Sequence, residues 1–120
     1  MDQPDFDTPG LAARLEHAGP AAADRLDFAA ILVDADGMVR ACNQAAAALP
    51  GLHATAAVGR AFYTEVAPSL ANADIRGRIQ RALERGALDL EFSHDGALSG
   101  LRGRMQPAAG GGFWLFLQAA

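Results

Sequence analysis

The feature that most constrains this chain is a tight turn between two short apolar runs. Residues 28–33 and 38–42 are the runs, and Asp34-Ala35-Asp36-Gly37 separates them. Aspartate favours turns because its side chain bonds to the nearby backbone, and glycine accepts the positive φ that such turns need. We therefore predict two antiparallel strands joined by this turn.

The remaining segments predict helices followed by strands. Asn43 is a typical capping residue, so it predicts a short helix up to residue 48, and a longer amphipathic helix is expected over 75–85. Three further strands are predicted at 88–93, 98–106 and 113–118. Before the hairpin, Asp7-Thr8-Pro9 and Gly19-Pro20 mark the start and end of a first helix, and residues 21–26 form a second.

This element order indicates an α+β fold, in which a five-stranded antiparallel sheet carries helices on one side and an N-terminal helical cap. The chain has 120 residues, enough for one domain with one core. We assign residues 1–26 to the cap and 27–120 to the core.

Charge and composition exclude several classes of function. The net charge of −4 disfavours nucleic acid as a partner, because phosphate binding wants a basic surface. Cys42 is the sole cysteine, so the chain has no internal disulfide. No apolar run is long enough to span a membrane, and the acidic N-terminus is unlike a signal peptide. We expect a cytoplasmic protein of bacterial type.

Several stretches carry a family resemblance. Residues 58–68 run VGRAFYTEVAP, and the closing segment 113–117 runs FWLFL. Together with the element order, they resemble PAS domains of the photoactive yellow protein family. The resemblance spans the whole chain and implies the PAS fold, with a pocket between the sheet and the segment 43–69. In that family, a cysteine thioester holds a coumaroyl chromophore in this pocket.

The chain departs from the family at the positions that serve the chromophore. Ser69 stands where the resemblance places the cysteine, which argues against covalent p-coumaric acid. Cys42 and Ala46 stand where the family has the tyrosine and glutamate that hold the phenolate, and Pro50 and Leu52 replace further polar residues. Buried charge without hydrogen-bond donors is costly, so the pocket suits neutral or apolar matter. The resemblance implies these lining residues: Ile31, Cys42, Ala46, Phe62, Val66 and Ser69.

The sequence does not decide two features of this pocket. Larger side chains such as Leu49 and Leu52 could fill it, or Ala45, Ala46 and Ala48 could line an open space. Cys42 is either a small core residue or a reactive thiol.

We expect a stand-alone sensory or regulatory PAS module that binds a small apolar ligand non-covalently and signals by conformational change. It would act on a partner signalling protein and could form a homodimer. One alternative is a protein-interaction or dimerisation module with a collapsed pocket. A second is a haem-binding or residual photoreceptor protein, with His53 as the haem ligand. We find no metal-ligand cluster and no nucleophile–base–acid set, so we do not expect an enzyme. The arginines of the longer helix predict a solvated face: Arg76, Arg78, Arg81 and Arg85.

Overall fold

The computed structural model describes residues 10–48, 57–66, 73–86, 88–92 and 101–119. Two helical segments precede the sheet, α1 (Leu11–Ala18) and the 3-10 helix η1 (Pro20–Arg25). Three more lie between the second and third strands: α2 (Gln44–Ala47), the π-helical turn η2 (Phe62–Val66) and α3 (Ala73–Arg85). The strands are β1 (Ala29–Val33), β2 (Val39–Cys42), β3 (Leu88–Phe92), β4 (Leu101–Pro107) and β5 (Phe113–Ala119).

The predicted hairpin is confirmed, and Asp34 organises its turn. Its Oδ1 accepts hydrogen bonds from the backbone N–H groups of Asp36 and Met38, both at 2.9 Å. Gly37 has a φ of 84°, which a side chain would strain. The Arg40 guanidinium pairs with Oδ2 of Asp34 across the turn.

The five strands form one antiparallel sheet in the order β2-β1-β5-β4-β3. Ile31 of β1 pairs with Cys42 of β2 on one side and with Leu115 of β5 on the other. The first strand, β1, and the last strand, β5, therefore pair with each other in the interior of the sheet. The predicted antiparallel sheet with helices is confirmed. The predicted strand at 98–106 is found as Leu101–Pro107, and residues 93–100 lie outside the described ranges.

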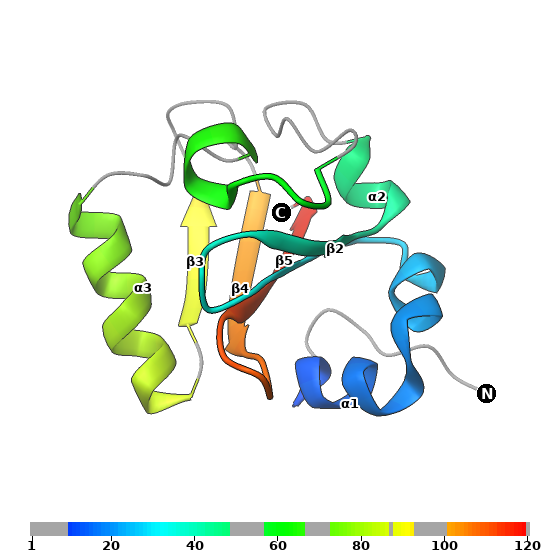
Figure 1. Cartoon of the computed structure of the whole chain (residues 1–120), viewed down its shortest axis with the longest axis horizontal. Coiled ribbons are helices and arrows are strands. Elements are labelled where there is room, and N and C mark those ends of the chain that lie inside the picture. Colours follow the sequence, from blue (N-terminus) through cyan, green and yellow to red (C-terminus); the bar gives the residue numbers. More distant parts are fainter. Residues whose placement is uncertain (1–9, 49–56, 67–72, 87, 93–100, 120) are drawn as a thin grey trace.

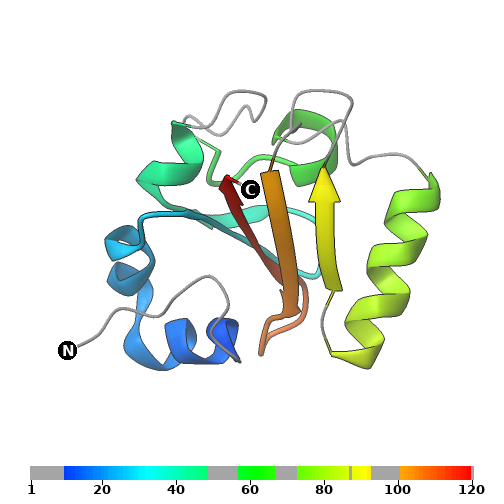
Figure 2. The same cartoon turned by 180° about the vertical axis from the view of Figure 1, so that it is seen from behind.

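Both faces of the sheet are covered, as Figures 1 and 2 show by placing α1 and α3 on opposite sides. Alternation along β1 and β5 sends side chains to each face in turn. The inner core joins one face to α2, η2 and α3, and its members are Ala29, Ile31, Val33, Val39, Ala46, Ala57, Phe62, Val66, Ile79, Met105, Phe113, Leu115 and Leu117. The outer core joins the other face to α1 and η1, and its members are Leu11, Ala12, Leu15, Ala23, Leu26, Phe28, Ala30, Trp114 and Phe116.

The first helix begins at Leu11, directly after Gly10, whose φ is 64°. The start signal that the sequence predicts at residues 7–9 lies outside the described residues. Leu11 and Leu15 are buried, and Gly19 separates α1 from η1. Within the part of the chain that the structure describes, no helix is long and apolar enough to cross a membrane.

Candidate functional site

Four of the predicted pocket residues come together in the inner core. Ile31, Ala46, Phe62 and Val66 are each 0% exposed, and they come from β1, α2 and η2. α2 and η2 pack on the face of the sheet to which the Ile31 side chain of β1 points. These four residues therefore lie in one cluster. Ser69, Leu49 and Leu52 lie outside the described residues, and the pocket itself stays a prediction. Ala48, which the sequence offers as a lining residue only if the pocket is open, is exposed directly after the single turn of α2.

Cys42 lies at the edge of this cluster. It is half-buried, packs against the inner core, and its Sγ lies 3.7 Å from the carbonyl oxygen of Asn43. Burial raises the pKa of the Cys42 thiol, and the negative charge of Asp24 adds to this effect. A raised pKa keeps the thiol protonated and weakly nucleophilic. The environment therefore favours the small core residue over the reactive thiol.

Phe62 connects the cluster to neighbouring aromatic rings. Its ring makes edge-to-face contacts with Tyr63 and Phe113, with centroids 5.0 Å and 5.5 Å apart. Edge-to-face pairs of this kind stabilise by about 0.5–1.5 kcal/mol beyond their area burial. The π-helical turn η2, which the sequence did not predict, places Phe62 and Val66 on its buried side. Single π turns often occur at functional sites.

Asn43 is the polar centre of the structure. It is 2% exposed, and its Oδ1 caps α2 by accepting from the N–H of Ala46 at 3.0 Å. The same oxygen accepts from the N–H of Ala30 in β1 at 2.9 Å. Its Nδ2 donates to the carbonyl oxygens of Ala23 in η1 and Phe28, at 2.8 Å and 2.9 Å. One buried side chain thus joins α2, β1 and the N-terminal cap.

Two polar side chains, Gln106 of β4 and Glu16 of α1, connect the cap to the β4–β5 hairpin. Oε1 of Gln106 in β4 accepts from the N–H of Ala12 at 2.7 Å, satisfying a donor in the first turn of α1. Oε1 of Glu16 accepts from Trp114 Nε1 and from the N–H of Ala109, both at 3.1 Å. The cap is therefore tied to the β4–β5 hairpin by hydrogen bonds as well as by apolar packing.

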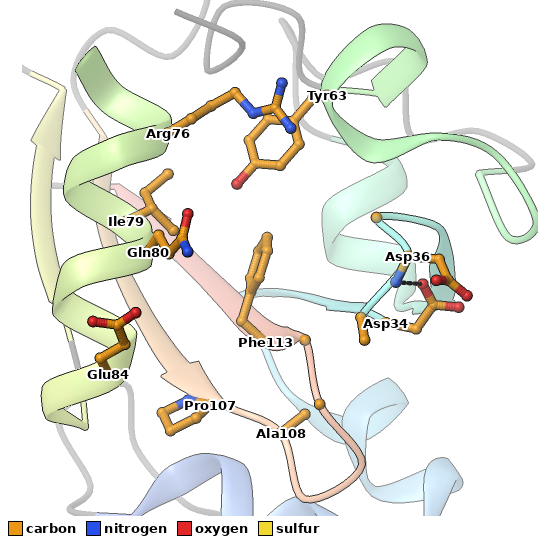
Figure 3. A pocket seen from close by; sticks show the side chains of 14 residues that line it. Asp34, Asp36, Tyr63, Arg76, Ile79, Gln80, Glu84, Pro107, Ala108 and Phe113 are labelled. Carbon is orange, nitrogen blue, oxygen red and sulfur yellow. Dashed lines mark hydrogen bonds between the residues drawn. The ribbon is translucent and has the colours of Figure 1, made fainter. Parts of the chain in front are cut away.

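A separate cavity of about 520 Å³ opens on the inner-core side, between α3 and two turns (Figure 3). None of the five described residues of the predicted pocket lines it. Its lining includes Tyr63. Burial raises the pKa of the Tyr63 hydroxyl, and the positive charge of Arg76 opposes this rise. The Arg76 guanidinium lies 4.5 Å from the centre of the Tyr63 ring. The sequence predicted this arginine as part of a solvated helix face.

The family model of the PAS fold matches residues 23–105. The chain belongs to the PAS-fold family. The match begins within η1 and covers the Asn43 network together with Ile31, Ala46, Phe62 and Val66. It gives the fold of the chain.

Two photoactive yellow proteins are among the known proteins similar to this chain. That of Rhodobacter capsulatus is 29% identical over 106 residues, covering 84% of this chain and 86% of the relative. That of Cereibacter sphaeroides is 27% identical over 104 residues, covering 82% and 84%. The crystal structure of the photoactive yellow protein domain from the sensor histidine kinase Ppr of Rhodospirillum centenum has a TM-score of 0.65. It is 30% identical, and the match covers 91% of this chain and 97% of that one.

The sequence did not reveal several contacts of this PAS domain. Asn43 was predicted as a helix cap, but its bonds to η1 and β1 depend on the tertiary fold. Glu16 and Gln106 bind residues more than ninety positions away in the sequence. His17 is exposed on α1, whereas His53 and His94 lie outside the described residues.

Proposed function

We propose that this PAS domain is a sensory and regulatory module that binds a small apolar ligand non-covalently and signals by moving its N-terminal cap. Its family membership supports the sensory role, because the similar proteins are photoactive yellow proteins and a domain of a sensor histidine kinase. The ligand would lie between the sheet and the segment from Asn43 to Ser69. The partner that receives the signal would be a second signalling protein.

The chemistry of the inner core supports an apolar ligand. The described pocket residues are apolar except for the neutral Cys42 thiol. Among the described residues, every buried side-chain nitrogen or oxygen has a hydrogen-bond partner. A phenolate at these positions would lack donors, and an unpaired buried charge is costly. With Ser69 in place of a cysteine, we propose that this protein carries no thioester-linked coumaroyl group.

The Asn43 network carries the proposed signalling step. Ala46, beside the proposed ligand, and Ala23, in the cap, both bond to the Asn43 side chain, at 3.0 Å and 2.8 Å. A ligand that shifts α2 moves the Oδ1 acceptor and with it the Nδ2 donor. The cap loses or gains a buried hydrogen bond in response, which shifts its population between attached and detached forms.

A neutral apolar dye, N-phenyl-1-naphthylamine, tests for the pocket. We expect its fluorescence to rise on addition to protein stripped of bound ligand. Ala46→Leu fills the proposed pocket and should abolish the rise, whereas Ala47→Leu, on the exposed neighbouring position of α2, should leave it intact. Circular dichroism checks that both variants fold. Equal dye binding by the two folded variants would remove the pocket from this site.

Two other functions have their own signatures in the same sample. A visible absorption band in freshly purified protein would indicate haem or a residual chromophore. A stable dimer that neither binds the dye nor contains extra mass would indicate an interaction module with a collapsed pocket. The proposed function predicts a protein spectrum without a visible band.

A further inference from the structure

The 520 Å³ cavity of Figure 3 lies outside the predicted PAS pocket and has the size of a small-molecule site. Its walls come from four parts of the chain that lie far apart in the sequence. These are the β1–β2 turn, Tyr63 of η2, one side of α3, and the β4–β5 turn. Ile79 and Phe113, which are 2% and 6% exposed, form an apolar base.

The β1–β2 turn and the β4–β5 turn pack closely against each other and form one wall of the cavity. A side chain on Gly112 would overlap the carbonyl oxygen of Val33, so only glycine permits this approach. Gly111 approaches Ala35 similarly, because an added Cβ would lie 3.1 Å from the Ala35 Cβ. Both glycines have positive φ, 95° at Gly111 and 76° at Gly112. The wall is therefore fixed by backbone packing, independently of any occupant.

Three polar side chains converge on the cavity with hydrogen-bonding capacity to spare. Figure 3 shows the Tyr63 hydroxyl and the Gln80 amide facing the Phe113 ring, with the Glu84 carboxylate on the next turn of α3. Within the described residues, none of these three groups has a hydrogen-bond or ion-pair partner. The Tyr63 hydroxyl stays protonated, so it can both donate and accept.

The charge of the lining is negative. The lining contains three carboxylates, Asp34, Asp36 and Glu84, and one cation, Arg76, and Asp34 is already paired with Arg40 outside the cavity. Arg76 is engaged with the Tyr63 ring. Glu84 and Asp36 are thus lining carboxylates without a cation partner among the described residues, and Glu84 lies on α3 together with Ile79 and Gln80. An occupant with a positive charge and a flat apolar body complements this arrangement.

We propose that this cavity is a second binding site, for small flat aromatic cations such as arylamidines. The aromatic ring packs over Phe113 and Ile79, and the cationic group pairs with Glu84. The Tyr63 hydroxyl and the Gln80 amide accept the remaining N–H groups. This site is additional to the apolar pocket of the proposed function and does not depend on it.

A matched pair of probes tests the proposal. Benzamidine and benzoate have the same planar shape and opposite charges, and binding is followed by amide chemical shifts of the whole protein. We expect benzamidine to shift the amides of 34–37, 76–84 and 108–113, and benzoate to bind more weakly. Glu84→Gln should weaken benzamidine binding by about two- to fivefold, which is typical of an exposed ion pair. Asp27→Asn, which removes an exposed carboxylate outside the cavity lining, should leave it unchanged.

Three results would overturn the proposal. Benzoate could bind as tightly as benzamidine, which would remove the role of charge. The benzamidine shifts could gather at Ile31, Ala46 and Val66, which would place the ligand in the PAS pocket. Glu84→Gln and Asp27→Asn could weaken binding equally, which would indicate non-specific attraction to an acidic protein.

Discussion

The Glu16 carboxylate of α1 accepts a hydrogen bond from the indole N–H of Trp114 in β5, at 3.1 Å. The same oxygen accepts from the backbone N–H of Ala109 in the β4–β5 turn. Trp114 also stacks on Phe116, with ring centroids 5.8 Å apart, so the indole is held in the outer core. These hydrogen bonds therefore attach the N-terminal cap to the central strand β5, within an interface that is otherwise apolar.

Removing this fastening should loosen the cap before the rest of the protein. Glu16→Ala eliminates both acceptor contacts, and we expect unfolding stability to fall by about 1 kcal/mol. Hydrogen exchange of the α1 amides should accelerate more than that of β1. Glu16→Gln retains an oxygen acceptor and serves as the control. If α1 in Glu16→Ala exchanges as slowly as in the parent, the bond does not hold the cap.

Asn43 should be among the most sensitive positions. Asn43→Ala leaves four buried backbone groups without their side-chain partner, and we expect a loss of about 3 kcal/mol or more in urea denaturation. Gln44→Ala, at the exposed next residue, should cost less than about 0.5 kcal/mol. Similar midpoints for the two variants would contradict the central role of the Asn43 network.

The contact between the β1–β2 turn and the β4–β5 turn can be tested with two glycine-to-alanine variants in the β4–β5 turn. Gly112→Ala introduces a side chain that overlaps the Val33 carbonyl oxygen and strains a φ of 76°. We expect it to cost more than about 2 kcal/mol in thermal or urea unfolding. Gly110→Ala adds the same methyl group where nothing lies within 4 Å. Equal stability of the two variants would show that the turns do not pack in this way.

The environment of Cys42 predicts both its reactivity and an effect of alkaline pH. Because burial raises its pKa, the folded thiol should react with iodoacetamide at pH 8 several-fold more slowly than free glutathione. The unfolded chain loses the thiol proton first, near the ordinary value of 9.0, so this group lowers stability as the pH rises past that value. Cys42→Ser should remove that part of the alkaline loss. Alkylation as fast as glutathione would identify Cys42 as an activated thiol.

Local sequence signals predicted much of the fold. The turn at Asp34 and Gly37 was recognised because both residues act through their own backbone neighbourhood, and Asn43 was recognised as a helix cap for the same reason. Ile31, Phe62 and Val66 were expected near one another because the resemblance supplied the tertiary arrangement. The π-helical turn was missed because its hydrogen-bond pattern has no simple sequence period.

The parts that sequence did not predict depend on distant segments. Glu16 is an ordinary surface residue in its own helix, and its role exists only where the β4–β5 hairpin passes α1. Tyr63, Gln80 and Glu84 come from two elements whose side chains meet through the packing of α3. The cavity that they share with Phe113 has no local signature, since no single segment contains two of its walls.

The most direct test of the central claim is the mass of the purified protein under native and denaturing conditions. A non-covalent ligand in the PAS pocket predicts a native mass above that of the 12.5 kDa chain, which returns to the chain mass on denaturation. Extra mass that survives denaturation would show a covalent group and contradict the account. A native mass equal to that of the bare chain, in protein never stripped of ligand, would contradict it as well.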